Sequence, residues 1–147
     1  MNQDFKDLLA AFINAGVKFL IIGGYAVIRH SEPRYTKDLD LWVASDIENA
    51  ERVFRALNEF GAPLDGLTPA DFSRPGYFYT MGQAPGRIDI LLDAKDLNFE
   101  ECWGRRDIFT LGELQVSYIS RDDLIVNKEA VGRLQDLADA EKLRQTK

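Results

Sequence analysis

Cysteine and histidine are almost absent from this chain of 147 residues, which holds one of each, Cys102 and His30. A single cysteine excludes a disulfide within the chain, and a single histidine excludes a zinc site built on several histidines. Because no N-terminal run resembles a secretory signal peptide, we expect the protein in the reducing cytoplasm. No apolar run approaches the roughly 18 residues that a membrane-spanning helix needs, so no membrane partner is expected.

A surplus of positive charge is also absent, because 18 Lys and Arg residues face 24 Asp and Glu residues, for a net charge of -6. This balance argues against non-specific binding to long nucleic acids, although it allows a local basic patch. The content of 46% hydrophobic residues argues against disorder. The length fits one domain over residues 1–147, with a core large enough to need no disulfide or metal.

Hydrophobic spacing and turn residues predict an α/β (α+β) fold with a small mixed sheet flanked by helices. Helices are expected at 3–15, at 25–30, from a cap at Ser45 or Asp46 to about 60, after Ser120, and at 134–144, with a short helix or a turn at 99–104. Strands are expected at 17–22, 37–43, 77–81, 87–92, 108–111 and 114–118, with 77–81 antiparallel to 87–92 and the last two forming a hairpin.

Acidic residues stand inside two of the predicted strands, where aspartate is disfavoured. Asp38 and Asp40 alternate with Leu39 and Leu41, so the two carboxylates share one face, about 7 Å apart at Cα. Asp89 is flanked by apolar residues in the same manner. Gathered carboxylates repel one another, and a hard divalent cation such as Mg²⁺ removes the repulsion while also binding substrate phosphates. This pattern indicates phosphoryl or nucleotidyl transfer.

A glycine pair, Gly23-Gly24, separates the first buried strand from a short helix. A tight turn there lets backbone N–H groups approach a phosphate, although a pair of glycines also fits a turn without a ligand.

Taken together, these elements resemble the nucleotidyltransferase superfamily with the polymerase-beta-like core. The resemblance rests on IIGGYAVIRHSEPRYTKDLDLWV (21–43), on RIDILL (87–92) and on DLIVNKEAVGRLQDLADAEKL (123–143), and it covers about residues 17–143. The last segment is similar to that of a bacterial subgroup, which includes the AbiEii-type toxins and uncharacterised nucleotidyltransferase-like proteins. Gly24 stands where many members have serine, and the chain lacks an evident accessory substrate domain.

The resemblance implies a transferase that moves a nucleoside monophosphate from a nucleoside triphosphate such as ATP to a hydroxyl of tRNA, a protein or a small molecule. Asp38, Asp40 and Asp89 would be the catalytic residues and the ligands of two Mg²⁺ or Mn²⁺ ions. Gly23 and Gly24 would cradle the phosphates. A toxin–antitoxin setting would add an antitoxin partner.

Basic residues near these motifs allow two interpretations each. Arg34 and Lys37 either reach phosphate or are solvated charges beside an acidic patch. Lys128 either extends from an apolar face to solvent or contacts the triphosphate or a site carboxylate, and the resemblance favours the second. Arg133, Asp136 and Asp139 fit surface ion pairs on a helix as well as a site. Leucines of the last helix would pack on the core or form a homodimer seam.

Two other functions stay open. The first is a non-catalytic nucleotide-binding or partner-binding domain of the same fold, although all three carboxylates are retained. The second is a metal-dependent nuclease, because Asp89 with Asp93-Ala94-Lys95 loosely resembles a nuclease arrangement. That reading leaves the glycine pair and the Asp-Leu-Asp strand unexplained.

Overall fold

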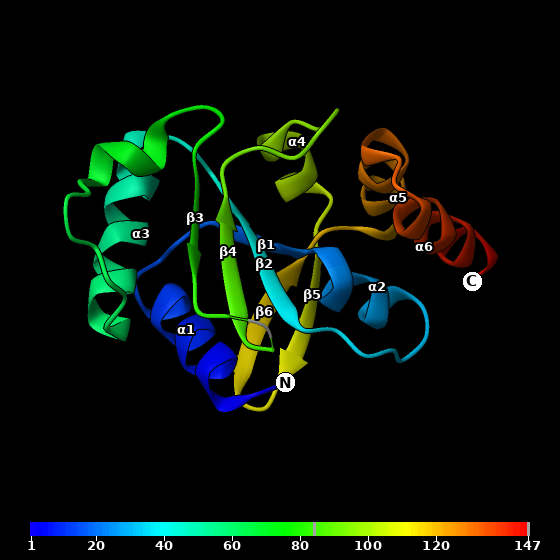
Figure 1. Cartoon of the computed structure of the whole chain (residues 1–147), viewed down its shortest axis with the longest axis horizontal. Coiled ribbons are helices and arrows are strands. Elements are labelled where there is room, and N and C mark those ends of the chain that lie inside the picture. The colour runs from blue at the N-terminus through cyan, green and yellow to red at the C-terminus, as the bar shows by residue number, and fades with distance from the viewer. Residues whose placement is uncertain (84, 147) are drawn as a thin grey trace.

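A mixed sheet flanked by helices forms the fold and confirms the expected fold class (Figure 1). The computed structural model describes residues 1–83 and 85–146. Along the sheet the strand order is β3-β4-β2-β1-β6-β5. The strands are β1 (Phe19–Ile22), β2 (Asp38–Val43), β3 (Phe78–Met81), β4 (Arg87–Leu91), β5 (Asp107–Leu111) and β6 (Leu114–Tyr118). Strand β2 is parallel to β4 and β1 to β6, whereas β1–β2, β3–β4 and β5–β6 are antiparallel pairs.

Helices lie on both sides of this sheet in the view of Figure 1, with α1 and α3 to its left and α2, α5 and α6 to its right. The bounds are α1 (Gln3–Asn14), α2 (Gly23–His30), α3 (Ile47–Phe60), α4 (Phe99–Gly104), α5 (Arg121–Val131) and α6 (Leu134–Gln145), with a 3₁₀ turn η1 (Pro69–Ser73). None of the helices in the described part of the chain is long and apolar enough to cross a membrane.

Local sequence explains where these helices begin and which face they bury. In α1, Phe5, Leu8, Leu9 and Phe12 recur at helical spacing and are all buried. Asp46 accepts a hydrogen bond from the Asn49 N–H and so caps α3, as the sequence predicted. The helix after the glycine pair starts earlier than expected, because Gly23 and Gly24 are themselves in the first turn of α2.

Strand β2 sets the position of the acidic residues. Leu39 and Leu41 are fully buried on one face, whereas Asp38 and Asp40 lie half-buried on the other, as the alternation predicted. The parallel pairing of β2 with β4 places Asp40 directly beside Asp89. The fold therefore brings the acidic residues of two distant segments to one face of two neighbouring strands.

Candidate active site

Asp40 is the centre of the acidic cluster. Its burial, followed by its hydrogen bond to Asp89 and the negative charges of Asp89 and Asp38, raises the pKa of Asp40 from 3.8 to about 7. The positive charge of Lys128 opposes this shift. The fold thus holds Asp40 where its charged form is costly unless a cation is near.

Arg87, one of the residues that the sequence pattern did not single out, bridges two of the carboxylates. Its Nη2 atom lies 2.9 Å from Asp38 Oδ2, and its Nε atom lies 3.3 Å from Asp89 Oδ2. Thr80, on the adjacent strand β3, donates to Asp89 Oδ1 at 2.8 Å. The signal for Arg87 was its place two residues before Asp89, because alternation puts both side chains on the same face.

The glycine pair packs against β2 and the loop before it, where side chains would not fit. Gly23 has a φ of +69°, and a Cβ atom there would collide with Asp40 Oδ2. A Cβ atom on Gly24 would collide with Thr36 Oγ1 and would lie 3.2 Å from an Arg34 guanidinium nitrogen. The start of α2 therefore lies close to the carboxylates, and glycine at both positions permits this close approach.

Lys128 is buried within a network of ion pairs rather than extended to solvent. Its Nζ atom lies 3.2 Å from Asp139 Oδ2 and 3.4 Å from Asp136 Oδ1, and both aspartates are at most 2% exposed. Arg34 Nη1 approaches Asp139 Oδ1 at 2.7 Å, and Arg133 Nε approaches Asp136 Oδ2 at 2.6 Å. The surface-pair interpretation of Asp136 and Asp139 was wrong, because docking of α6 on α5 buries both.

The pKa of Asp136 shows the strength of this network. Burial acts to raise it, but hydrogen bonding from Arg133 and the charge of Lys128 outweigh burial and keep the pKa below its usual value. Asp136 is therefore held as a carboxylate in a buried place, and it fixes Lys128 near Asp40.

Most of the predicted site residues, though not Asp89 or Lys37, line a cavity of about 270 Å³, here called the carboxylate cavity. Its walls come from α2, β2, α5 and α6 and from the loop before β2. It is lined by Gly23, Gly24, Arg34, Thr36, Asp38, Asp40, Lys128, Arg133, Gln135, Asp136 and Asp139. An adjoining cavity of about 200 Å³ shares Gly23, Asp40, Lys128, Arg133 and Asp136 with it and extends to Asp93, Lys95 and Asn127.

Two predicted site residues do not line the carboxylate cavity: Asp89, which lies beside Asp40 on β4, and Lys37. Lys37 is exposed and lines a different hollow, together with Tyr25, Tyr35 and Pro85. The physical reason is strand alternation, which turns Lys37 away from its neighbour Asp38. Arg34 lines both this hollow and the carboxylate cavity, so its contact with phosphate stays a prediction.

The oxygen donors of Asp38, Asp40 and Asp89 suit a hard cation such as Mg²⁺. Asp38 Oδ1 fits such a ligand, because it is buried without a hydrogen-bond partner among the described residues. Within residues 1–83 and 85–146, however, no three His, Cys, Asp or Glu side chains are already grouped to hold a metal. The donor chemistry fits the ion, and Arg87 contacts two of the three carboxylates.

Comparison with known proteins identifies the fold. No protein-family model matches the chain, and no curated protein matches its sequence. Among solved structures, it is similar to the lincosamide antibiotic adenylyltransferase LnuA in its lincomycin-bound form, with a TM-score of 0.61 and 14% sequence identity. The match covers 98% of this chain and 96% of LnuA. The chain therefore shares its overall fold with LnuA, in agreement with the polymerase-beta-like core that its motifs resemble.

Proposed function

We propose that this protein is a Mg²⁺-dependent nucleotidyltransferase, which moves a nucleoside monophosphate from a nucleoside triphosphate to an acceptor hydroxyl. One observation carries the proposal: Asp40 and Asp89 lie side by side on parallel strands, and the cavity at Asp40 is walled by Gly23, Gly24 and buried Lys128. A single pocket thus combines carboxylates for a metal with a glycine turn and a cation for phosphates.

The residues divide the chemistry among them. The N–H groups of Gly23 and Gly24 and the charges of Lys128 and Arg34 would hold the terminal phosphates and orient the α-phosphorus. Asp89 would accept the proton of the acceptor hydroxyl, whose oxygen forms a bond to the α-phosphorus while the bond to pyrophosphate breaks. Mg²⁺ held by Asp38, Asp40 and Asp89 would neutralise charge on the attacking and leaving oxygens.

A small molecule is the acceptor that we favour. LnuA, which has this fold, is named for adenylylation of an antibiotic. The net charge of -6 disfavours long nucleic acids, although a tRNA end would need only a local patch. A toxin of a toxin–antitoxin pair would instead modify tRNA or a protein. The assay below therefore tests these two acceptors separately.

Label transfer tests the proposal. The protein is incubated with each α-³²P nucleoside triphosphate, Mg²⁺ and, separately, total tRNA, protein lysate and a small-molecule extract. We expect a labelled product whose formation falls by about 100-fold or more in Asp38→Asn and Asp40→Asn, because each substitution removes a metal ligand. Asp65→Asn, an exposed loop substitution, is the matched control.

A second candidate, a non-catalytic nucleotide-binding domain, is favoured by the ion pairs that occupy Asp38 and Asp89 with Arg87. Triphosphate binding without transfer to any acceptor fraction would support it. Mg²⁺-dependent cleavage of nucleic acid without triphosphate binding would instead refute both and indicate a nuclease.

A further inference from the structure

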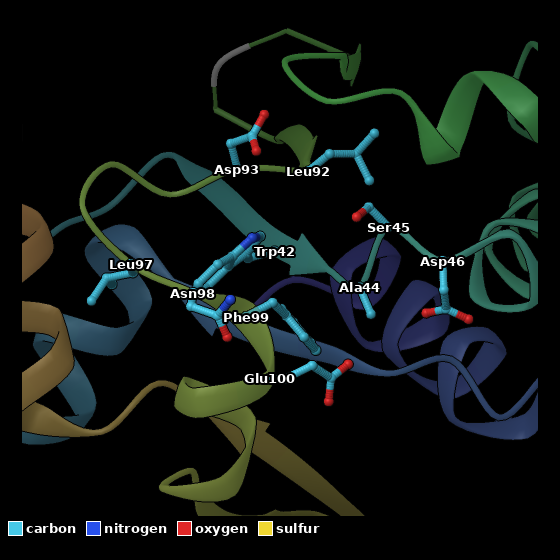
Figure 2. Close-up of a pocket in the computed structure, with 10 residues that line it drawn as sticks. All are labelled: Trp42, Ala44, Ser45, Asp46, Leu92, Asp93, Leu97, Asn98, Phe99 and Glu100. Atoms are coloured by element: carbon cyan, nitrogen blue, oxygen red, sulfur yellow. The ribbon is translucent and has the colours of Figure 1, made fainter.

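A larger cavity of about 440 Å³ lies on the same side of β2 as the carboxylates, and the transfer chemistry does not use it (Figure 2). It is lined by Trp42, Ala44, Ser45, Asp46, Leu92, Asp93, Leu97, Asn98, Phe99 and Glu100, and is called the Trp42 cavity here. Trp42 follows Asp40 by two residues, so their side chains share a face about 7 Å apart along the strand. Asp93 lines both the Trp42 cavity and the cavity that adjoins Asp40.

The lining of the Trp42 cavity is acidic and aromatic. Asp46, Asp93 and Glu100 contribute carboxylates, and none of the described residues that line the cavity is basic. Trp42 and Phe99 meet edge to face with ring centroids 5.1 Å apart. Three carboxylates in a lining without a basic residue favour a positively charged group such as an ammonium ion.

Each carboxylate keeps its position through a contact outside the cavity. Asp46 accepts from the Asn49 N–H at 3.1 Å, Asp93 accepts from the Gly76 N–H, and Glu100 pairs with Lys18 at 3.2 Å. Each of these contacts uses one carboxylate oxygen, which leaves the second for a ligand. A triphosphate or a nucleic-acid backbone would be repelled by three such groups.

The indole of Trp42 gives an independent sign of a ligand. Trp42 is 1% exposed, and its Nε1 donor has no hydrogen-bond partner among the described residues. An unpaired buried donor is costly, and in Figure 2 the ring stands at the wall of the cavity, between Asp93 and Phe99. A hydroxyl or ether oxygen of a ligand would satisfy it.

We propose that the Trp42 cavity binds the acceptor, and that the acceptor is a small hydroxylated molecule with a protonated amine. The amine would face Asp46, Asp93 and Glu100, and an oxygen would accept from Trp42 Nε1. The identity of this site as an acceptor site rests on the proposed nucleotidyl transfer, whereas its preference for a cation does not. Because Asp93 lines both this cavity and the one that adjoins Asp40, a bound molecule that extends past Asp93 would bring a hydroxyl near Asp40.

Nuclear magnetic resonance of the indole N–H groups tests this proposal. The chain has two tryptophans, so Trp103→Phe assigns the Trp42 signal. The probes are glucosamine and ethanolamine, each compared with its N-acetyl derivative, which keeps the hydroxyls but has no charge. We expect both amines to shift the Trp42 signal and the N-acetyl forms to shift it far less.

A charge-removing variant gives the second comparison. In Asp46→Asn/Glu100→Gln, where asparagine can still cap α3, we expect amine binding to weaken by roughly fivefold. Glu113→Gln, an exposed change in the β5–β6 turn, is the control and should bind like the wild type.

Three results would overturn the proposal: equal binding of amines and N-acetyl forms, no loss in the double variant, or displacement of the amines by a non-hydrolysable ATP analogue at the Trp42 signal. The third result would assign the cavity to the nucleobase. Amine binding in this pattern without label transfer would refute the transferase function alone and leave the cation site standing. Label transfer without amine binding would refute this acceptor class alone.

Discussion

At the scale of single residues, Arg87 neutralises part of the negative charge of the acidic cluster. Its guanidinium pairs with Asp38 and Asp89, and so supplies the positive charge that the grouped carboxylates need. Because the Arg87 side chain is 44% exposed, this pairing is screened by solvent and can be exchanged for a stronger cation. If Mg²⁺ binds these carboxylates, as we propose, Arg87 would compete with it for the same oxygens.

Replacing Arg87 by glutamine should reveal this competition. Without a metal, Arg87→Gln should lower the free energy of unfolding by about 1 kcal/mol or less, because the pairs are partly exposed. With Mg²⁺ or Mn²⁺, the variant should bind the ion more tightly than the wild type and gain more stability from it. Isothermal titration and thermal unfolding with and without EDTA measure both effects.

Arg74→Gln is the matched control, because Arg74 pairs with Asp71 in η1 rather than with a site carboxylate. An identical response to metal in Arg87→Gln, Arg74→Gln and the wild type would contradict the role assigned to Arg87.

Helices α5 and α6 illustrate how an element places a functional group. Neither helix has a strongly apolar surface toward the site; instead, Lys128 of α5 is locked by Asp136 and Asp139 of α6. Burial of charged groups is favourable only when they are paired. The ion pairs that hold Lys128 at the carboxylate cavity thus also join α5 to α6, in addition to the buried apolar residues Leu124 and Leu143.

Lys128→Met should therefore cost far more stability than an ordinary surface change. It would leave Asp136 and Asp139 buried with fewer cations, and we expect a loss of about 3–5 kcal/mol in urea unfolding. Lys142, also on α6, forms a half-exposed ion pair with Glu32. Lys142→Met should therefore cost about 1 kcal/mol or less. Equal losses in the two variants would show that the buried network does not dock α6.

Asp40 links the site to the stability of the whole molecule. Its pKa is about 7 in the folded protein against 3.8 as the usual value, mainly because of burial and then Asp89. Between these two pH values the folded state binds more protons than the unfolded state, so the free energy of unfolding falls as the pH rises. The contribution is fully present below 3.8 and is lost once the pH passes about 7.

Urea unfolding of the metal-free protein from pH 5 to pH 8 should therefore show a decline that Asp40→Asn reduces. One unit of pKa difference corresponds to about 1.4 kcal/mol, which is well within the sensitivity of such curves. Asp65→Asn, in an exposed loop, should retain the wild-type slope. A pH slope that is unchanged in Asp40→Asn would show that another group controls it.

The sequence by itself determined the features that depend on neighbours along the chain. The alternation of Asp38 and Asp40 with Leu39 and Leu41 required one polar and one buried face, and the helical spacing in α1 required an apolar stripe. The N-terminal cap of α3 at Asp46 also depends only on residues that are close in the sequence. These features follow from backbone geometry, which a short segment already specifies.

Only the tertiary structure decided which distant groups meet. The parallel register of β2 and β4 put Asp40 beside Asp89 and let Arg87 bridge the carboxylates. Docking of α6 buried Asp136 and Asp139 around Lys128, where the spacing along one helix had fitted surface pairs as well as a site. Burial and electrostatic pairing depend on the surroundings in three dimensions, so no local pattern could fix the charge state or the partners of these groups.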